Sequence, residues 1–293
     1  MIHNDFEVVL NEIIRLNNCF SQLSHASNLI GKWIDDGKTK AQAEALPKIL
    51  DRYYDYLVGN LELSGFNEAV VYERVSLLNT YYDFFYSNHY DNLFSSQGKL
   101  RPTILEEFMF LLFKDYVSYL KDLVGDSEGV LDCGSAKAYT NLYFSSKGLK
   151  DFIQSPVVCI NEKNQDFAIF RVFRLGTNKS HKDIRIPIVA IENKTYIDKT
   201  MLDGIISTAD RIKTGNPYSM FIAVAENYDV DLSVDPAYSR IDQIYVLRKS
   251  KRKERWASID SQVVWRMFCD VKEHIERPWS NVEDKLRNEG III

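Results

Sequence analysis

Apolar residues recur every three or four positions through most of the first 125 residues. This spacing is typical of amphipathic helices, and it predicts them over residues 5–23, 41–58, 67–87 and 103–123. Thr103 and Glu106 have the spacing of a capping box at the start of the last of these helices. Gly59 is expected to end the second. We therefore expect a helical N-terminal region.

After residue 130 the pattern changes to short apolar runs separated by polar segments. It predicts strands over 157–160, 167–173, 184–194, 220–225 and 241–247, a polar turn at 161–164, and helices over 199–213 and 258–276. The helix at 199–213, which Asp198 can cap, joins two strands, and such a crossover implies that the strands are parallel. The expected fold is α/β, a mixed sheet flanked by helices, and the Gly- and Ser-containing segment 125–135 is the expected junction.

The strand at 184–194 ends in charged residues. Its apolar run, Ile188 to Ile191, is followed at once by Glu192, Asn193 and Lys194. Residues two apart on a strand point to the same face, so Glu192 and Lys194 should project together. Charges at the end of a buried strand are costly unless a metal ion, an anionic ligand or a mutual ion pair compensates them. A second Glu-x-Lys at 283–285 lies in a polar segment and is expected to be solvated surface.

Two further acidic residues could complete a site of this kind. Asp166 lies one strand earlier in the chain, where its carboxylate could share a cation with Glu192, and alternatively it caps the polar turn before it. Glu107 stands among apolar residues near the start of a helix. It is a candidate third metal ligand, and alternatively it interacts with the positive end of the helix dipole.

The net charge of −5 does not by itself suggest a nucleic-acid-binding protein, but the charge is unevenly distributed. Residues 248–255 (RKSKRKER) carry a net charge of +5, which predicts either a solvated basic loop or a phosphate-contacting patch. The four cysteines are scattered, and the five histidines lack the spacing of zinc ligands. With no signal peptide and no apolar run of about 18 residues, we expect a reduced, cytoplasmic protein that does not enter membranes.

Three segments resemble a known enzyme family. TNLYFSSKG (140–148), INEKNQDFAI (160–169) and VAIENKTYIDKTMLD (189–203) are similar to the type II restriction endonucleases of the BbvCI and DdeI kind, which are PD-(D/E)XK nucleases. The resemblance implies that Asp166, Glu192 and Lys194 are catalytic and that Asp166 and Glu192 bind Mg²⁺. The sequence departs from the motif at Gln165, because the family pattern has proline before the aspartate.

The same resemblance implies Mg²⁺-dependent, site-specific hydrolysis of duplex DNA, giving 5′-phosphate ends at a C-TNAG-like site. The chain would act as a homodimer or as a heterodimer with a related subunit. Residues 1–130 would serve DNA recognition or dimerisation, and 131–293 would form the nuclease core. Candidate DNA-binding residues are Lys199, Arg211, Lys249, Lys251, Arg252 and Lys253.

Three alternative functions stay open on the sequence. The chain could be a non-catalytic DNA-binding subunit, or a subunit of a heterodimeric enzyme that nicks one strand. It could also be a repair or recombination nuclease that uses the same core.

Overall fold

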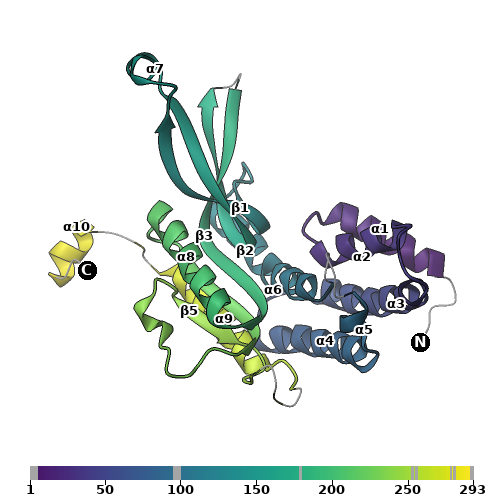
Figure 1. Ribbon diagram of the computed structural model, residues 1–293. Coiled ribbons are helices and arrows are strands. Elements are labelled where there is room, and N and C mark those ends of the chain that lie inside the picture. The colour runs from purple at the N-terminus through teal and green to yellow at the C-terminus, as the bar shows by residue number, and fades with distance from the viewer. Residues whose placement is uncertain are drawn as a thin grey trace.

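The computed structural model describes residues 6–94, 100–177, 180–251, 254, 257–277, 279 and 282–290. Its first half is helical: α1 (Phe6–Cys19), α2 (Ser24–Ile34), α3 (Lys40–Glu62), α4 (Glu68–Ser87), α5 (Tyr90–Leu93) and α6 (Leu100–Val124). Its second half contains β1 (Leu131–Ser145), α7 (Leu149–Gln154), β2 (Val157–Thr177), β3 (Ser180–Ile197), α8 (Lys199–Gly215), β4 (Met220–Tyr228), η1 (Pro236–Tyr238), β5 (Gln243–Val246), α9 (Ser261–Glu276), α10 (Val282–Asp284) and η2 (Lys285–Glu289) (Figure 1).

The five strands form one mixed sheet in the order β1-β2-β3-β4-β5. β2 pairs antiparallel with both β1 and β3, whereas β3, β4 and β5 pair parallel, and β1 also meets β3 in parallel at Ala138↔Arg185. Helix α8 connects β3 to β4, and Asp198 caps it by accepting a hydrogen bond from the Met201 N–H at 2.8 Å. The predicted crossover, its cap and the parallel pairing are therefore confirmed.

Each face of the sheet is covered by helices. Along β4, Ile222 and Val224 face the larger core with α6 and α9, while Phe221, Ala223 and Ala225 face α8. β4 is buried on both faces, which explains its unbroken apolar sequence. The fold class expected from the sequence is thus the one observed.

The larger core continues from the N-terminal helices into the sheet. Phe113 of α6 stacks on Phe167 of β2 and on Phe268 of α9, with ring centroids 5.6 and 5.3 Å apart. Helix α6 therefore packs directly on the sheet. The division of the chain at residue 130 stays a prediction.

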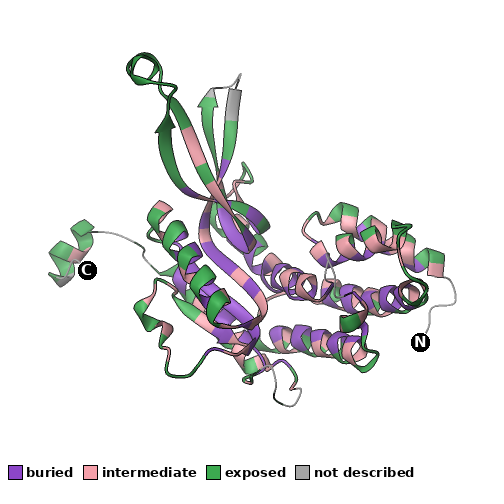
Figure 2. Cartoon of the chain, viewed as in Figure 1, coloured by how far each residue is buried: buried purple, intermediate pink, exposed green. Residues whose placement is uncertain are grey.

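Two β-ribbons project from the body of the molecule in the same direction (Figure 1). The first is formed by the end of β1 and the start of β2, which pair as far as Ser145↔Val157, and it carries α7 at its tip. The second is formed by the end of β2 and the start of β3, which pair as far as Thr177↔Ser180. Much of both ribbons is exposed to solvent (Figure 2).

Several predicted elements differ from the observed ones. The polar turn expected at 161–164 is absent, because β2 continues through it as part of the first ribbon, where polar residues are tolerated. Helix α6 begins at Leu100 and not at Thr103, whose hydroxyl donates to the Leu100 carbonyl at 2.7 Å instead of capping the helix. Gly59 lies inside α3, with the Leu77 side chain 3.1 Å from where a Cβ would stand.

Helices α2, α5 and α7 are among the elements that were not predicted. No side chain of α2's own segment caps its N-terminus. The acceptor comes from α6 instead, since Glu107 receives the N–H groups of His25 and Ala26 at 2.9 and 3.0 Å. Among the described residues, none of the helices combines the length and apolarity needed to span a bilayer.

Candidate active site

The candidate catalytic residues lie where β2 and β3 separate. Pairing between these strands runs as far as Phe167↔Ile191, and beyond that point β2 continues along β1. At the point of separation the Asn193 N–H donates to Asp166 Oδ2 at 2.7 Å. The Asp166 carboxylate thus accepts a backbone hydrogen bond from the neighbouring strand, which fixes its position beside β3.

Asp166, Glu192 and Lys194 come together as predicted. Lys194 Nζ lies 2.9 Å from Glu192 Oε1 and 3.9 Å from Asp166 Oδ2. The three side chains are 32, 18 and 28% exposed in that order of residue number, so the group is partly buried but open to solvent. Two carboxylates and one ammonium therefore converge at an accessible position where the two inner strands β2 and β3 separate.

The surroundings of this group are apolar on the β4 side. Glu192 is paired with Ala223 and Lys194 with Ala225, both fully buried. Burial raises the pKa of Asp166, while Lys194 and the Asn193 N–H act to lower it. Burial has the larger effect on the pKa of Asp166.

A third carboxylate, Glu106 of α6, lies within electrostatic reach of this group. Burial, and then the negative charge of Asp166, raise the pKa of Glu106 to about 7, and Lys194 partly opposes them. The sequence had assigned Glu106 to a capping box, so its electrostatic interaction with this group was not predicted. Its proximity follows from how α6 packs on the sheet.

The structure does not bring Glu107 to this group. Its carboxylate is fully buried among the N-terminal helices, where it accepts the Tyr53 hydroxyl at 2.8 Å and the two N–H groups at the start of α2. Both carboxylate oxygens are therefore engaged in a structural contact. Of the two adjacent glutamates, the one near the candidate site is Glu106.

The donor set fits a hard divalent cation. The described residues contain no group of three or more His, Cys, Asp or Glu side chains arranged to hold a metal ion by themselves. Mg²⁺, however, is commonly held by one or two carboxylates together with water and substrate phosphates. Asp166 and Glu192 provide two such carboxylates at an open edge of the sheet.

Gln165 occupies the position of the proline in the usual motif. It is paired with Ala136 of β1 inside a continuous strand, where a proline would remove a backbone donor. Its side chain is almost fully buried. The departure from the motif therefore does not displace Asp166.

Four of the predicted DNA-binding residues are described, and all four are exposed. Lys199 pairs with Asp203 at 2.8 Å, and Lys249 pairs with Asp260 at 2.5 Å. Lys251 is exposed in the same loop as Lys249. Arg252 and Lys253 lie outside the described residues.

Arg211 lines a polar hollow of about 480 Å³ between α8 and the base of the first ribbon. Lys163 lines the same hollow, together with Glu162 and Asp210. The hollow is therefore of mixed charge.

The first residue of the basic segment belongs to a buried cluster that the sequence did not predict. Arg248 and Glu226 are almost fully buried and paired at 3.0 Å, and Arg101 of α6 also reaches Glu226 at 3.0 Å. The Arg248 guanidinium lies over the Tyr82 ring, 5.1 Å from its centroid. Arg248 is thus a structural residue. The sequence signal for this cluster was Glu226, a charged residue directly after the apolar run of β4.

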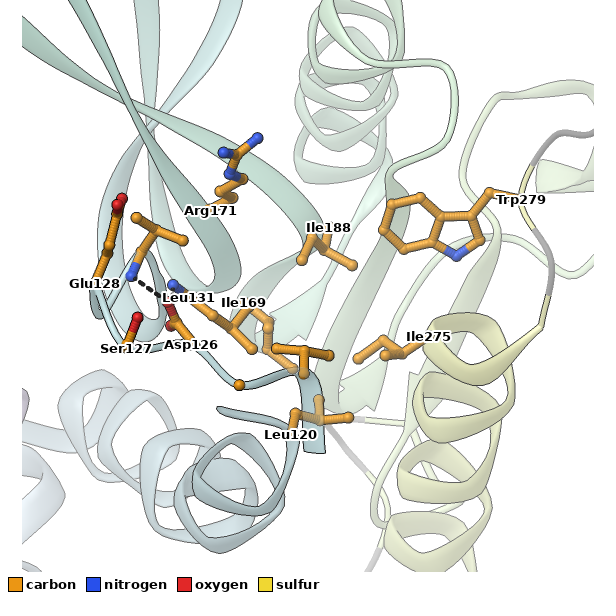
Figure 3. Close-up of a pocket in the computed structure, with 13 residues that line it drawn as sticks. Leu120, Asp126, Ser127, Glu128, Leu131, Ile169, Arg171, Ile188, Ile275 and Trp279 are labelled. Carbon is orange, nitrogen blue, oxygen red and sulfur yellow. Dashed lines mark hydrogen bonds between the residues drawn. The ribbon is translucent and has the colours of Figure 1, made fainter. Parts of the chain in front are cut away.

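An apolar hollow of about 530 Å³ lies elsewhere on the sheet, between the end of α6 and the C-terminal segment. Figure 3 shows Leu120, Ile169, Ile188, Ile275 and Trp279 around it. None of the three predicted catalytic residues lines it; its acidic lining residues are Asp126 and Glu128, and Asp126 accepts the N–H groups of Val130 and Leu131. The converging charged side chains therefore lie where β2 and β3 separate and not at this hollow.

Comparisons with known proteins agree with this fold. The model of the Bpu10I restriction endonuclease family matches residues 97–278, which include α6, all five strands, α8 and α9. A solved structure described as the native BbvCI A2B2 tetramer superposes with a TM-score of 0.66, at 20% sequence identity, over 87% of this chain and 95% of that one. No curated protein sequence matches the chain.

Proposed function

Because this chain belongs to the Bpu10I restriction endonuclease family, we propose that Asp166, Glu192 and Lys194 are the catalytic residues of this type II site-specific deoxyribonuclease. The observation that carries the proposal is the convergence of the three side chains where β2 and β3 separate, with Lys194 within 4 Å of both carboxylates. Charges at the end of a buried strand cost free energy, so packing alone does not explain why these three residues are charged.

Enzymes of this family generally use divalent metal ions, and the cation proposed here is Mg²⁺. Asp166 and Glu192 would hold it, and the negative charge of Glu106, which interacts electrostatically with Asp166, would add to the attraction for the cation. A cation at this position would stabilise negative charge on the scissile phosphate. The buried alanines of β4 that pair with Glu192 and Lys194 lower the local dielectric constant, which strengthens these electrostatic interactions.

The Lys194 ammonium has two roles in the proposal. It compensates the repulsion between the two carboxylates, and it donates hydrogen bonds that orient the attacking water beside the phosphate. Attack on phosphorus breaks the bond to O3′ and leaves a 5′-phosphate and a 3′-hydroxyl. The recognised sequence is proposed to be C-TNAG-like.

The chain is further proposed to act with a second subunit, either another copy or a related chain. One catalytic group per chain serves one DNA strand, so a double-strand break needs two. The BbvCI structure with the same fold is described as an A2B2 tetramer. Residues 1–130 would contribute to DNA recognition or to the subunit contact.

The test is cleavage of a long duplex DNA with and without Mg²⁺, followed by sequencing of the ends. We expect discrete fragments with Mg²⁺ and none with a chelator. Glu192→Ala and Lys194→Ala should each reduce cleavage by at least about 10³-fold while DNA binding is retained. If either variant cuts at the wild-type rate, the catalytic assignment is wrong.

The chain contains a matched control for this experiment. Glu283 and Lys285 form a second Glu-x-Lys, and Glu283 is exposed and paired with Arg287 at 2.9 Å. Glu283→Ala and Lys285→Ala should leave cleavage unchanged. Cleavage by the wild type at random positions, or only at branched or damaged DNA, would favour a repair nuclease instead.

Glu106 and its neighbour provide a second matched pair. Glu106→Gln should raise the Mg²⁺ concentration needed for half-maximal cleavage by about 10-fold or more, since loss of a group supporting a metal site commonly costs this much. Glu107→Gln should leave the Mg²⁺ requirement unchanged, because Glu107 is engaged with α2 and Tyr53. If the wild type and Glu106→Gln need the same Mg²⁺ concentration for half-maximal cleavage, Glu106 does not contribute to the metal site.

A further inference from the structure

Two cations line the polar hollow between α8 and the base of the first ribbon. Lys163 comes from β2 and Arg211 from α8, so they belong to different walls. Lys163 is half-buried and Arg211 is exposed, and within the described part of the chain neither forms an ion pair. Lys163 was not among the DNA-binding residues predicted from the sequence.

The two acidic residues of this hollow are compensated from outside it. Glu162 pairs with Lys182 of the second ribbon at 3.1 Å, and Asp210 pairs with Arg240 at 3.8 Å. Neither of these two partners lines the hollow. The charges of the two cations inside the hollow are therefore left to attract an anion.

Lys163 lies on the same face of the sheet as the candidate catalytic group. It pairs with Ala138 of β1, while Glu192 and Lys194 pair with two alanines of β4, and all three alanines belong to the core that α8 covers. Residues paired across strands share a face. Burial raises the pKa of Asp166, and Lys163 is one of the cations that act to lower it, so Lys163 is within electrostatic reach of this group.

The hollow has the size and the position for part of a DNA strand. Its volume of about 480 Å³ is that of a site for a small molecule or one nucleotide. Lys163 is three residues from Asp166, roughly 10 Å along a strand. Phosphates of one DNA strand follow each other about every 3.4 Å along the helix axis. A strand with its scissile phosphate at Asp166 therefore presents another phosphate, up to about three nucleotides away, to Lys163.

We propose that Lys163 and Arg211 together bind a non-scissile phosphate of the DNA strand that is cut, and so hold that strand in place beside the catalytic group. This inference rests on the proposed function, which places a DNA strand at Asp166. An ammonium and a guanidinium are the side chains that recognise phosphate oxygens. Both residues contact the backbone away from the bond that breaks, so they position the strand and do not distinguish bases.

The test is the affinity of the full chain for duplex DNA, measured by fluorescence anisotropy at several salt concentrations with a chelator present so that no strand is cut. Lys163→Gln and Arg211→Gln should each weaken binding about 10-fold, the effect of losing one hydrogen bond to a charged group. The slope of log affinity against log salt should become less negative by about 0.9 in each, because fewer counterions are released. Duplexes of unrelated sequence should be affected equally.

Two variants serve as controls. Lys163→Arg keeps the charge and should keep the wild-type slope. Lys272→Gln removes an equal charge from α9, on the other face of the sheet, where Lys272 pairs with Glu276 at 3.1 Å; it should bind DNA as the wild type does. If Lys163→Gln or Arg211→Gln keeps the wild-type slope, the inference is wrong, and a lower melting temperature with an unchanged slope would assign that residue to stability alone.

Uncharged phosphates locate the contact once the cleavage site is known. In a series of duplexes, each with one phosphate replaced by methylphosphonate, one replacement within about three nucleotides of the cut should weaken binding by the wild type. The same replacement should not weaken binding by Lys163→Gln further, because the contact is already lost. If every replacement affects the two proteins equally, Lys163 does not bind a phosphate.

These outcomes are distinguishable from those of the cleavage test. A wild type that cuts DNA, with unchanged salt slopes in both variants, overturns this inference alone. Binding that depends on both cations, in a chain that does not cut DNA, overturns the proposed function and leaves the phosphate contact standing. A wild type that binds no duplex DNA overturns both.

Discussion

At the scale of single residues, burial acts on Glu107 and His25 in opposite directions. Burial raises the pKa of Glu107 to about 7 and outweighs the hydrogen bonds from Ala26, Tyr53 and His25, which lower it. Burial lowers the pKa of His25 to about 3. His25 is well satisfied as a neutral ring, with Nδ1 2.8 Å from the Thr103 hydroxyl and Nε2 2.9 Å from the Tyr81 hydroxyl.

These shifts have opposite consequences for stability. Glu107 contributes stability that is fully present below pH 4.5 and is lost as the pH rises through about 7. His25 contributes stability that is present above pH 6.5 and is lost as the pH falls toward 3. Between pH 4.5 and 6.5 the two effects oppose each other.

Replacing either Glu107 or His25 should therefore make the pH dependence of stability that is due to the other residue measurable. In Glu107→Gln, the free energy of unfolding should fall on acidification from pH 6.5 to 4.5, by up to about 1.4 kcal/mol per pH unit more than in the wild type. In His25→Gln it should rise over the same range. Urea denaturation at several pH values measures both slopes, and slopes equal to that of the wild type would contradict the assignment.

At the scale of elements, close packing of α8 on β1 depends on one glycine. A Cβ on Gly215 would stand 2.1 Å from the Thr140 carbonyl oxygen, a backbone atom that cannot move aside cheaply. Gly204, in the same helix, has nothing within 4 Å of the corresponding position. The two glycines therefore differ in purpose, although both lie in one helix.

Alanine substitutions should separate these two positions. Gly215→Ala should destabilise the protein by about 1–3 kcal/mol, the usual cost of overpacking. Gly204→Ala should stabilise it by up to about 1 kcal/mol, because alanine loses less backbone entropy in a helix. Thermal or urea unfolding of the two variants decides this, and a stabilised Gly215→Ala would show that α8 can shift away from β1.

At the scale of the whole molecule, the cluster around Glu226 joins distant parts of the chain. Its carboxylate on β4 receives Arg101 from α6, Arg248 from the segment after β5 and the Tyr82 hydroxyl of α4. Arg101 lies near the start of the helix that presents Glu106, so the cluster also fixes the helix beside the candidate site. Buried ion pairs of this kind are costly to break singly.

Glu226→Ala should consequently destabilise the protein by about 3–5 kcal/mol, because it leaves the buried Arg248 guanidinium without its carboxylate. The melting temperature in a calorimeter measures this loss. Glu283→Ala, which removes an exposed helical ion pair, should change stability by less than about 0.5 kcal/mol. Similar effects of the two variants would mean that Arg248 finds another partner.

Much of the candidate site was predictable from local sequence. Glu192 and Lys194 share a face because residues alternate along a strand, and the crossover through α8 makes β3 and β4 parallel. The apolar run before Glu192 marked the buried strand. These features depend on residues near one another in the chain.

Tertiary structure alone decided the rest. Whether Glu106 or Glu107 faces the sheet depends on how α6 is rotated against it, and adjacent helix residues point about 100° apart. Helix α2 is capped by a carboxylate from α6, and Arg248 is buried by a glutamate 22 positions away. Contacts between distant segments form only once the elements have packed, so no local pattern in the sequence specifies them.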